Sequence, residues 1–193
     1  MLFRSPKELA RLGRIDLADR RNRVLAHVAR RWRSDPPSGF VVAAGISTNA
    51  PAICALLRTV AFMPAGQVVL AALDQHMTAE EWDAIGPFDP DPVTGRSLRA
   101  QESHPQYQLK SMLDRLGIAR EEVTLWRWGG GHDARAARTR NISNAMVVPA
   151  YTGKWRDLKA DERTFNGVRL LEAATPAEEA QRSEEHTSEL QSH

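Results

Sequence analysis

Two uninterrupted apolar runs, separated by one amphipathic helix, constrain the fold of this chain more than any other feature. The first run is FVVAAG, Phe40–Gly45, and the second is QVVLAALD, Gln67–Asp74. Between them Pro51 opens a stretch whose apolar residues recur at helical spacing: Ile53, Leu56, Leu57 and Val60. Strands without polar alternation are typical of a parallel sheet covered on both faces, and parallel neighbours need a crossover helix. The pattern therefore predicts a β–α–β unit.

The remaining segments extend this unit to an α/β fold, a mostly parallel sheet with flanking helices. Helices are predicted over 6–33 (one or two), after a capping box at Thr78 and Glu81, from Pro105 to Gly117, over 134–146, over 155–163 and from 175. Further strands are predicted at 121–126 and 168–173. We divide the chain into a basic helical segment (1–36), an α/β core (37–165) and the start of a next domain (166–181).

Composition narrows the class of protein. The chain has 193 residues, of which 42% are hydrophobic and 26% charged, and this is ordinary for a globular domain with a real core. The single cysteine, Cys54, excludes an internal disulfide and any multi-cysteine metal site within this chain, and is expected in the core. The N-terminus is too charged for a secretory signal and no run is long enough to cross a membrane. We expect a cytoplasmic protein without a membrane partner.

The last segment, RSEEHTSELQSH at 182–193, has neither periodicity nor an apolar face. We identify it as the translation of a sequencing-adapter oligonucleotide and exclude it from fold reasoning. We therefore expect the natural protein to continue beyond Gln181. Since the segment holds one basic and three acidic residues, removing it raises the net charge from +2 to +4.

The turn after the first apolar run is a candidate phosphate-binding site. Gly45 is followed by Ser47, Thr48 and Asn49, but no lysine follows, so a Walker A loop is absent, and the dinucleotide fingerprint also fails. The free amides of the helix start can still hold an anion. The alternative, which we favour, is that Thr48 or Asn49 caps the helix.

Asp74 ends the second apolar run, as the magnesium-binding acid of a Walker B strand does. The next residue is Gln75, and not the second acid of an active helicase motor. Without a P-loop lysine no ATPase can be argued, so we expect Asp74 to cap the following turn. We predict no catalytic residue, and whether the chain is an enzyme stays open.

Other polar residues give weaker signals. His132 and Asp133 are too few ligands for a metal site, so none is predicted. Arg127 and Trp128 belong to a loop that can stack on single-stranded nucleic acid or pin itself to the core. Basic residues of the first segment, among them Arg30, Arg31 and Arg33, can follow a phosphate backbone or form a solvated helix face. That helix is expected to bury Val24, Leu25, Val28 and Trp32.

The order of several motifs resembles AddB, the helicase/nuclease subunit of the AddAB complex, and is closest to its alphaproteobacterial branch. The motifs are VVAAGISTNAPAICALL, GQVVLAALDQHM, SHPQYQLKSMLDRLGIAREEV and VRLLEAATPAEEA. They cover nearly all of 1–181, and the helix that begins at His104, Pro105 and Gln106 is the most specific. Asn49 and the AALD sequence depart from the family pattern. The resemblance implies part of a superfamily-one helicase-like domain, of the P-loop NTPase type, that lacks its P-loop.

This resemblance implies a fragment that serves as a DNA-translocase scaffold in double-strand break repair, where DNA ends are unwound and resected for homologous recombination. Its implied partners are DNA ends and an AddA-type helicase–nuclease subunit. The parent complex uses ATP and magnesium, and an iron–sulfur cluster belongs to a nuclease domain outside this fragment, so no cofactor is expected here. The scaffold residues are Gly45, Ser47, Thr48, Asp74, His104, Pro105 and Gln106. The alternative is a self-contained α/β enzyme that binds a nucleotide or small molecule.

Overall fold

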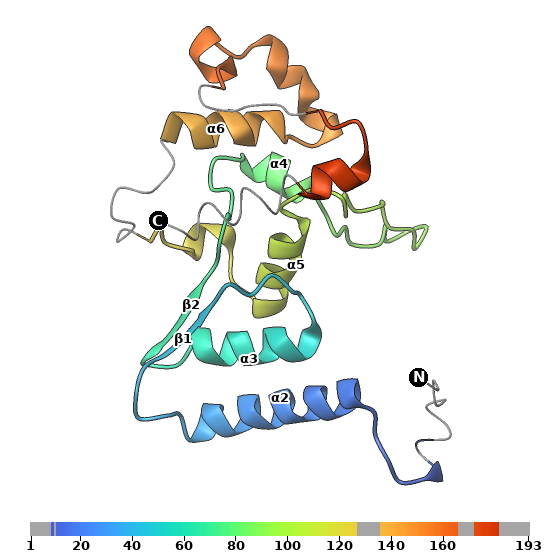
Figure 1. Ribbon diagram of the computed structural model, residues 1–193, viewed down its shortest axis with the longest axis vertical. Helices are drawn as coiled ribbons and strands as arrows, with labels where there is room; N and C mark the ends of the chain where they lie inside the picture. The colour runs from blue at the N-terminus through green and yellow to red at the C-terminus, as the bar shows by residue number, and fades with distance from the viewer. Residues whose placement is uncertain (1–8, 10, 127–135, 166–171, 182–193) are drawn as a thin grey trace.

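The computed structural model describes residues 9, 11–126, 136–165 and 172–181. In the described chain the elements are α2 (Leu17–Ser34), β1 (Val41–Ala44), α3 (Pro51–Ala61), β2 (Gly66–Val69), α4 (Ala79–Asp83), α5 (Tyr107–Leu116), α6 (Ala136–Ala145) and three 3-10 helices, η1 (Arg120–Glu122), η2 (Pro149–Arg156) and η3 (Ala160–Arg163). Figure 1 shows α2 beneath α3, α5 and α4 above α3, and α6 with η2 and η3 at the far end. The chain is therefore α/β in a general sense.

The predicted β–α–β unit is confirmed, although the sheet is small. β1 and β2 pair in parallel with Val41 opposite Gly66 and Ala44 opposite Val69, and they form the two-stranded sheet of the described residues. Helix α3 crosses between them and packs so closely on β2 that a Cβ at Gly66 would lie 1.9 Å from the Val60 carbonyl oxygen. Glycine is needed here because the backbones approach without room for a side chain.

The prediction that both faces of the sheet are covered is wrong for the described chain. Ala43 and Val68 point towards α3 and α5 and pack on the buried cluster of Cys54, Leu57, Met112 and Leu116. On the other face Val42 is 47% exposed, and Ala44 and Gln67 are exposed as well. The apolar runs thus predicted the two strands correctly, but they did not predict that only one face of the sheet would be covered by helices of the described chain.

Several boundaries differ from the predicted ones. β2 ends at Val69, before Asp74 is reached, because the chain turns at Ala72, which has a φ of +58°. The predicted strand over 121–126 is wrong, since η1 occupies its start and the rest has no ladder partner in the described chain. The predicted strand over 168–173 lies largely outside the described residues, whereas a helix is present over 176–181, as predicted.

The core of the molecule has two parts that share α5. One part is the cluster beneath the sheet, and the other gathers Met77, Trp82, Ile85, Leu113 and Val148. The predicted apolar face of α5 is confirmed for Met112, Leu113 and Leu116, which are all at most 2% exposed. Gly117 ends the helix in the left-handed region with a φ of +65°, as its position in the sequence predicts.

Helix α2 is attached less firmly. Its N-cap is Asp16, whose carboxylate accepts the amide of Asp19 at 2.6 Å. Ala29 is its one fully buried residue, and Thr59 of α3 donates its hydroxyl to the Ala29 carbonyl at 3.4 Å. The predicted apolar face needs a correction, because Val24 is 53% exposed and only Leu25, Val28 and Trp32 are half-buried.

Candidate functional site

The turn after β1 is exposed and its predicted cap is wrong. Gly45 has a φ of +70°, a backbone conformation that favours glycine, and Ser47 and Thr48 are exposed. The N-cap of α3 is Ala50, which offers no side-chain oxygen. Within the described chain the hydroxyl of Thr48 accepts the Ala50 amide, at 3.3 Å. No side chain of the turn therefore caps α3 in the described chain.

Asn49 has a different role from the predicted cap. Its side-chain amide donates to the hydroxyl of Ser111 at 3.0 Å, and Ser111 is buried on α5. The residue that departs from the AddB pattern at this turn thus ties the turn to the central helix. A buried hydroxyl that has a partner avoids the free-energy penalty of an unsatisfied polar group.

Asp74 caps the turn that follows it, as the sequence predicts. Its carboxylate accepts the amide of His76 at 2.8 Å, and its own amide donates to the side-chain oxygen of Gln106 at 2.9 Å. The predicted position at the end of a strand is wrong, because Asp74 lies in the loop 70–76 and residues 70–73 separate it from β2. The same loop carries the left-handed residue Ala72.

The His104–Gln106 motif holds this loop in place. Gln106 donates its side-chain amide to the Ala72 carbonyl at 2.9 Å while accepting the Asp74 amide, so one side chain brackets the loop. His104 accepts the Gln106 amide at Nδ1, 3.2 Å away, which assigns the proton to Nε2, and Nε2 donates to the Met146 carbonyl at 2.6 Å. Pro105 is exposed between them. The motif thus connects the loop, α5 and the end of α6.

The described site residues that the sequence predicted lie in three separate parts of the structure: a hydrogen-bond network, the turn after β1, and helix α2. Asp74, His104 and Gln106 form one network, whereas no hydrogen bond within the described chain joins Gly45, Ser47 or Thr48 to it. The candidate arginines of the first segment, Arg30, Arg31 and Arg33, lie on α2, on the opposite side of α3 from this network (Figure 1). Arg127 and Trp128 lie outside the described residues, as do His132 and Asp133.

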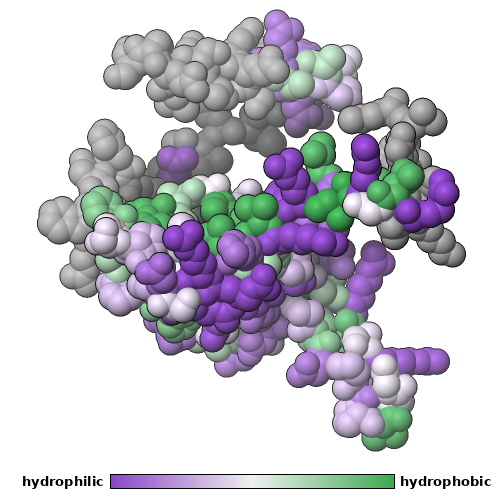
Figure 2. Space-filling model, turned by 90° about the horizontal axis from the view of Figure 1, so that it is seen from below, coloured by the Kyte–Doolittle hydropathy of each residue, from purple (hydrophilic) through white to green (hydrophobic). Residues whose placement is uncertain are grey.

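Helix α2 carries the basic surface. It contains six arginines and one acidic residue, Asp19, and all six arginines are exposed: Arg20, Arg21, Arg23, Arg30, Arg31 and Arg33. Arg23 pairs with Asp19 at 2.9 Å, and this pairing raises the pKa of its guanidinium. Arg31 lies 4.0 Å from Asp35, and Arg33 donates to the Ala29 carbonyl at 3.2 Å. Seen from below, where α2 lies, the molecule is largely hydrophilic (Figure 2).

A cluster of cations around Trp82 was not predicted. Lys110 and Arg120 place their charges 5.5 and 5.0 Å from its ring, which suits cation–π attraction. Arg120 is 8% exposed and pairs with Glu121 at 3.1 Å, and its Nη1 is the buried side-chain atom without a hydrogen bond among the described residues. The capping box of Thr78 and Glu81 was predicted, but nothing in the sequence links Trp82 to these two distant cations.

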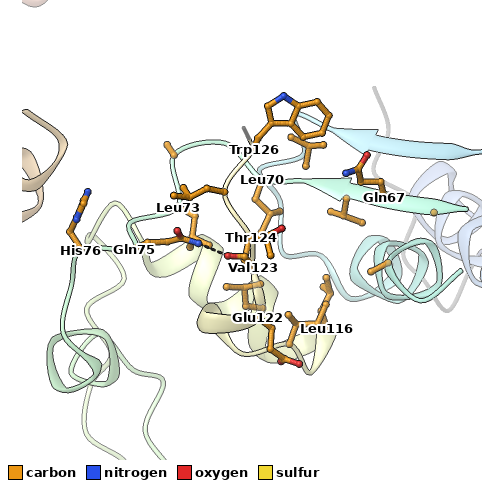
Figure 3. Close-up of a pocket in the computed structure, with 18 of the residues that line it drawn as sticks. Gln67, Leu70, Leu73, Gln75, His76, Leu116, Glu122, Val123, Thr124 and Trp126 are labelled. Carbon is orange, nitrogen blue, oxygen red and sulfur yellow. Dashed lines mark hydrogen bonds between the residues drawn. The ribbon is translucent and has the colours of Figure 1, made fainter. Parts of the chain in front are cut away.

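A long groove runs beside β2, and we call it the β2 groove. It has a volume of about 1580 Å³, and Figure 3 shows the side chains that line it. One wall is Gly66–Leu70 and the other is 122–126, and Leu113, Leu116 and Ile118 belong to its apolar lining. The side chain of Gln75 crosses from the loop after β2 to the other wall and donates to the Val123 carbonyl at 2.5 Å.

The described chain has neither a cluster of metal ligands nor an exposed thiol. No three histidine, cysteine, aspartate or glutamate residues of that part gather as metal ligands. Cys54 is 2% exposed, as expected of a core residue, and burial raises the pKa of its thiol. Among the described helices none is long and apolar enough to cross a membrane.

Comparisons of the chain with protein-family models, with curated proteins and with solved structures give no match. The resemblance to AddB therefore stays a prediction from the sequence motifs.

Proposed function

We propose that this chain is part of an AddB-like subunit of a helicase–nuclease, in which it serves as a DNA-translocase scaffold during double-strand break repair. The observation that carries the scaffold role is the network at the sheet's carboxyl edge. The polar groups of Asp74, His104 and Gln106 make hydrogen bonds to backbone groups of this chain. These bonds use hydrogen-bonding capacity of the three side chains to fix a loop rather than to hold a ligand.

The same proposal gives the chain its partners and setting. An AddA-type subunit would supply the motor, ATP and magnesium would serve the complex, and an iron–sulfur cluster would belong to a nuclease domain outside this chain. The place of action would be the cytoplasm. Homologous recombination would then use the resected DNA ends.

The surface we assign to DNA is the solvent face of α2. Phosphate contacts need exposed cations that are not engaged by acids, and α2 has six arginines against one aspartate. Within the described chain Arg20, Arg21 and Arg30 form no salt bridge, and all three are exposed. Binding through these side chains would be independent of base sequence, as suits a protein that moves along DNA.

The alternative, a self-contained nucleotide-binding enzyme, rests on the exposed turn after β1. Gly45, Ser47 and Thr48 are exposed beside the start of α3, where the Ala52 amide has no hydrogen bond within the described chain and could meet an anion. This alternative is weaker because the turn offers no cation and because the carboxylate of Asp74 already accepts the His76 amide. It predicts micromolar binding of magnesium–ATP that Asp74→Ala abolishes, and isothermal calorimetry measures this directly.

The DNA proposal is tested with two matched triple variants. One neutralises α2 by Arg20→Ala, Arg30→Ala and Arg31→Ala, and the control removes the same charge elsewhere by Arg96→Ala, Arg99→Ala and Arg163→Ala. All six side chains are exposed, so both variants keep the core intact. Fluorescence anisotropy with single-stranded and duplex oligonucleotides over a salt series gives the affinity and its salt dependence.

We expect weak binding, with Kd roughly 10⁻⁴ to 10⁻⁶ M at physiological salt. The α2 variant should reduce the slope of log K against log salt by roughly one unit for each phosphate that its arginines neutralise, and the control should not. Equal slopes for the two variants would remove α2 from the DNA path. Binding that does not respond to salt would contradict the phosphate mechanism altogether.

A further inference from the structure

The outer edge of β2 presents backbone groups to the β2 groove. In a parallel pair a residue bonds the two neighbours of its partner, and Val41, which is opposite Gly66, donates its amide to the Ala65 carbonyl at 2.9 Å. By the same register the backbone groups of Gln67 and Val69 face β1. Those of Val68 and Leu70 consequently face the groove. An exposed row of such groups is a template for another strand.

The groove beside this edge suits a polypeptide better than a small molecule. Its volume of about 1580 Å³ exceeds the roughly 300–1,000 Å³ of typical small-molecule pockets. It follows β2 along Gly66–Leu70, and the segment 122–126 forms the facing wall (Figure 3). The partly exposed side chains of Ile118, Val123 and Leu125 give the lining apolar surface on which alternate side chains of an added strand can pack.

The edge lacks the features that keep an unpaired strand from association. Natural edge strands are protected by lysine, by proline or by bulges, and the stretch Gly66–Leu70 contains no charged residue and no proline. On the facing wall Leu125 is 73% exposed and Trp126 is 51% exposed. Exposed apolar groups beside an open edge are typical of a surface that a partner covers.

The charge of the groove limits which partner fits. Glu122 is the one charged carboxylate among its described lining residues, and lysine and arginine do not occur there. Glu122 is exposed, and its carboxylate accepts the amide of Ala119 at 2.6 Å, so the negative charge is held at a fixed place on the wall. A basic residue on the partner complements it, whereas an acidic one is repelled.

We propose that β2 accepts an extended strand of a protein partner, apolar at alternate positions and basic where it passes Glu122. The strand would bond the backbone groups of Val68 and Leu70 and place its apolar side chains against the lining of the groove. This inference does not depend on the DNA-scaffold function, since it uses a different part of the fold from the exposed face of α2.

The test uses amide hydrogen exchange of the whole chain, followed by NMR. The probe is the capped synthetic peptide Lys-Val-Thr-Val-Thr-Val-Lys, and its counterpart has glutamate in place of both lysines. With the lysine peptide the amides of Val68 and Leu70 should exchange at least about tenfold more slowly. The amides of Gln67 and Val69 already face β1 and should not change. The glutamate peptide should protect far less.

A variant pair on the surface completes the design. Trp126→Lys changes the facing wall of the groove, and Leu98→Lys places the same charge on a loop residue that is 74% exposed. We expect Trp126→Lys to abolish the protection by the lysine peptide, because it removes an apolar contact and repels the basic strand, and Leu98→Lys to retain it. The proposal fails if Val68 and Leu70 are as protected as Gln67 and Val69 without peptide, because the edge is then already paired. The proposal is also overturned if the lysine peptide protects the Val68 amide equally in the two variants. It is overturned likewise if the lysine and glutamate peptides protect Val68 equally in the unmodified chain.

Discussion

At the scale of single residues, Gln106 has the largest structural role of the motif that resembles AddB. Its side-chain amide both donates to Ala72 and accepts from Asp74, so it satisfies a carbonyl and an N–H of a loop that has no ladder of its own. His104 fixes the Gln106 backbone in turn. A glutamine can do this and an ionised acid cannot, because only the amide is donor and acceptor at once.

We predict that Gln106→Ala lowers the free energy of unfolding by about 1–3 kcal/mol, since it removes two hydrogen bonds to the backbone of the loop. Urea denaturation measures the change. Gln108→Ala is the matched control, because Gln108 is exposed on the same helix and should change stability by less than about 0.5 kcal/mol. Equal effects of the two substitutions would show that the hydrogen bonds from Gln106 to Ala72 and Asp74 contribute nothing to the free energy of unfolding.

At the scale of elements, the end of α5 depends on one glycine. Gly117 has a φ of +65°, and a Cβ at this position would lie 2.7 Å from Nη1 of Arg58. Arg58 uses that nitrogen to donate to the Leu116 carbonyl, so it satisfies one of the free carbonyls at the helix end. The termination of α5 and the position of α3 are therefore coupled through this side chain.

Gly117→Ala should destabilise the protein by about 1–2 kcal/mol, because an L-residue is strained in the left-handed region and its Cβ displaces Arg58. Gly153→Ala is the control, since a Cβ there meets no atom within 4 Å and the residue lies in η2. Thermal denaturation of both variants gives the comparison. A Gly117→Ala protein as stable as the Gly153→Ala protein would show that Arg58 and the backbone adjust at no cost.

At the scale of the whole molecule, stability is distributed unevenly. Helix α5 contributes to both parts of the core, with Leu116 at 1% exposure in one part and Leu113 at 2% in the other. Helix α2 lies outside α3 and fully buries only Ala29. Local opening is easiest where few apolar side chains are buried. The proposed DNA-binding helix is thus held less firmly than α3 and α5.

Native-state hydrogen exchange should therefore give lower opening free energies for the amides of α2 than for those of α5. The difference should reach at least about 1–2 kcal/mol, because burying one leucine-sized side chain contributes that much. Saturating DNA should reduce the difference if α2 holds the phosphates. Equal protection of the two helices in the free protein would mean that α2 is part of the cooperative core.

The local elements of this protein follow from short-range signals in its sequence. Apolar periodicity predicted α3 and the buried face of α5, proline and glycine marked their ends, and the capping box at Thr78 and Glu81 marked α4. Such signals act over a few residues and need no knowledge of distant partners. The motif at His104–Gln106 also singled out residues that form a network, although it did not predict what they bind.

Which surfaces are covered, and where polar side chains find partners, depends instead on how the elements pack. The apolar run of β1 predicted burial on both faces, yet Val42 is exposed, because coverage depends on neighbours that the run does not encode. Asn49 was expected to cap a helix and instead bonds Ser111, 62 residues away. Trp82 contacts Lys110 and Arg120, which also lie far from it in the sequence. Contacts between residues far apart in the sequence follow from packing, which a local pattern does not specify.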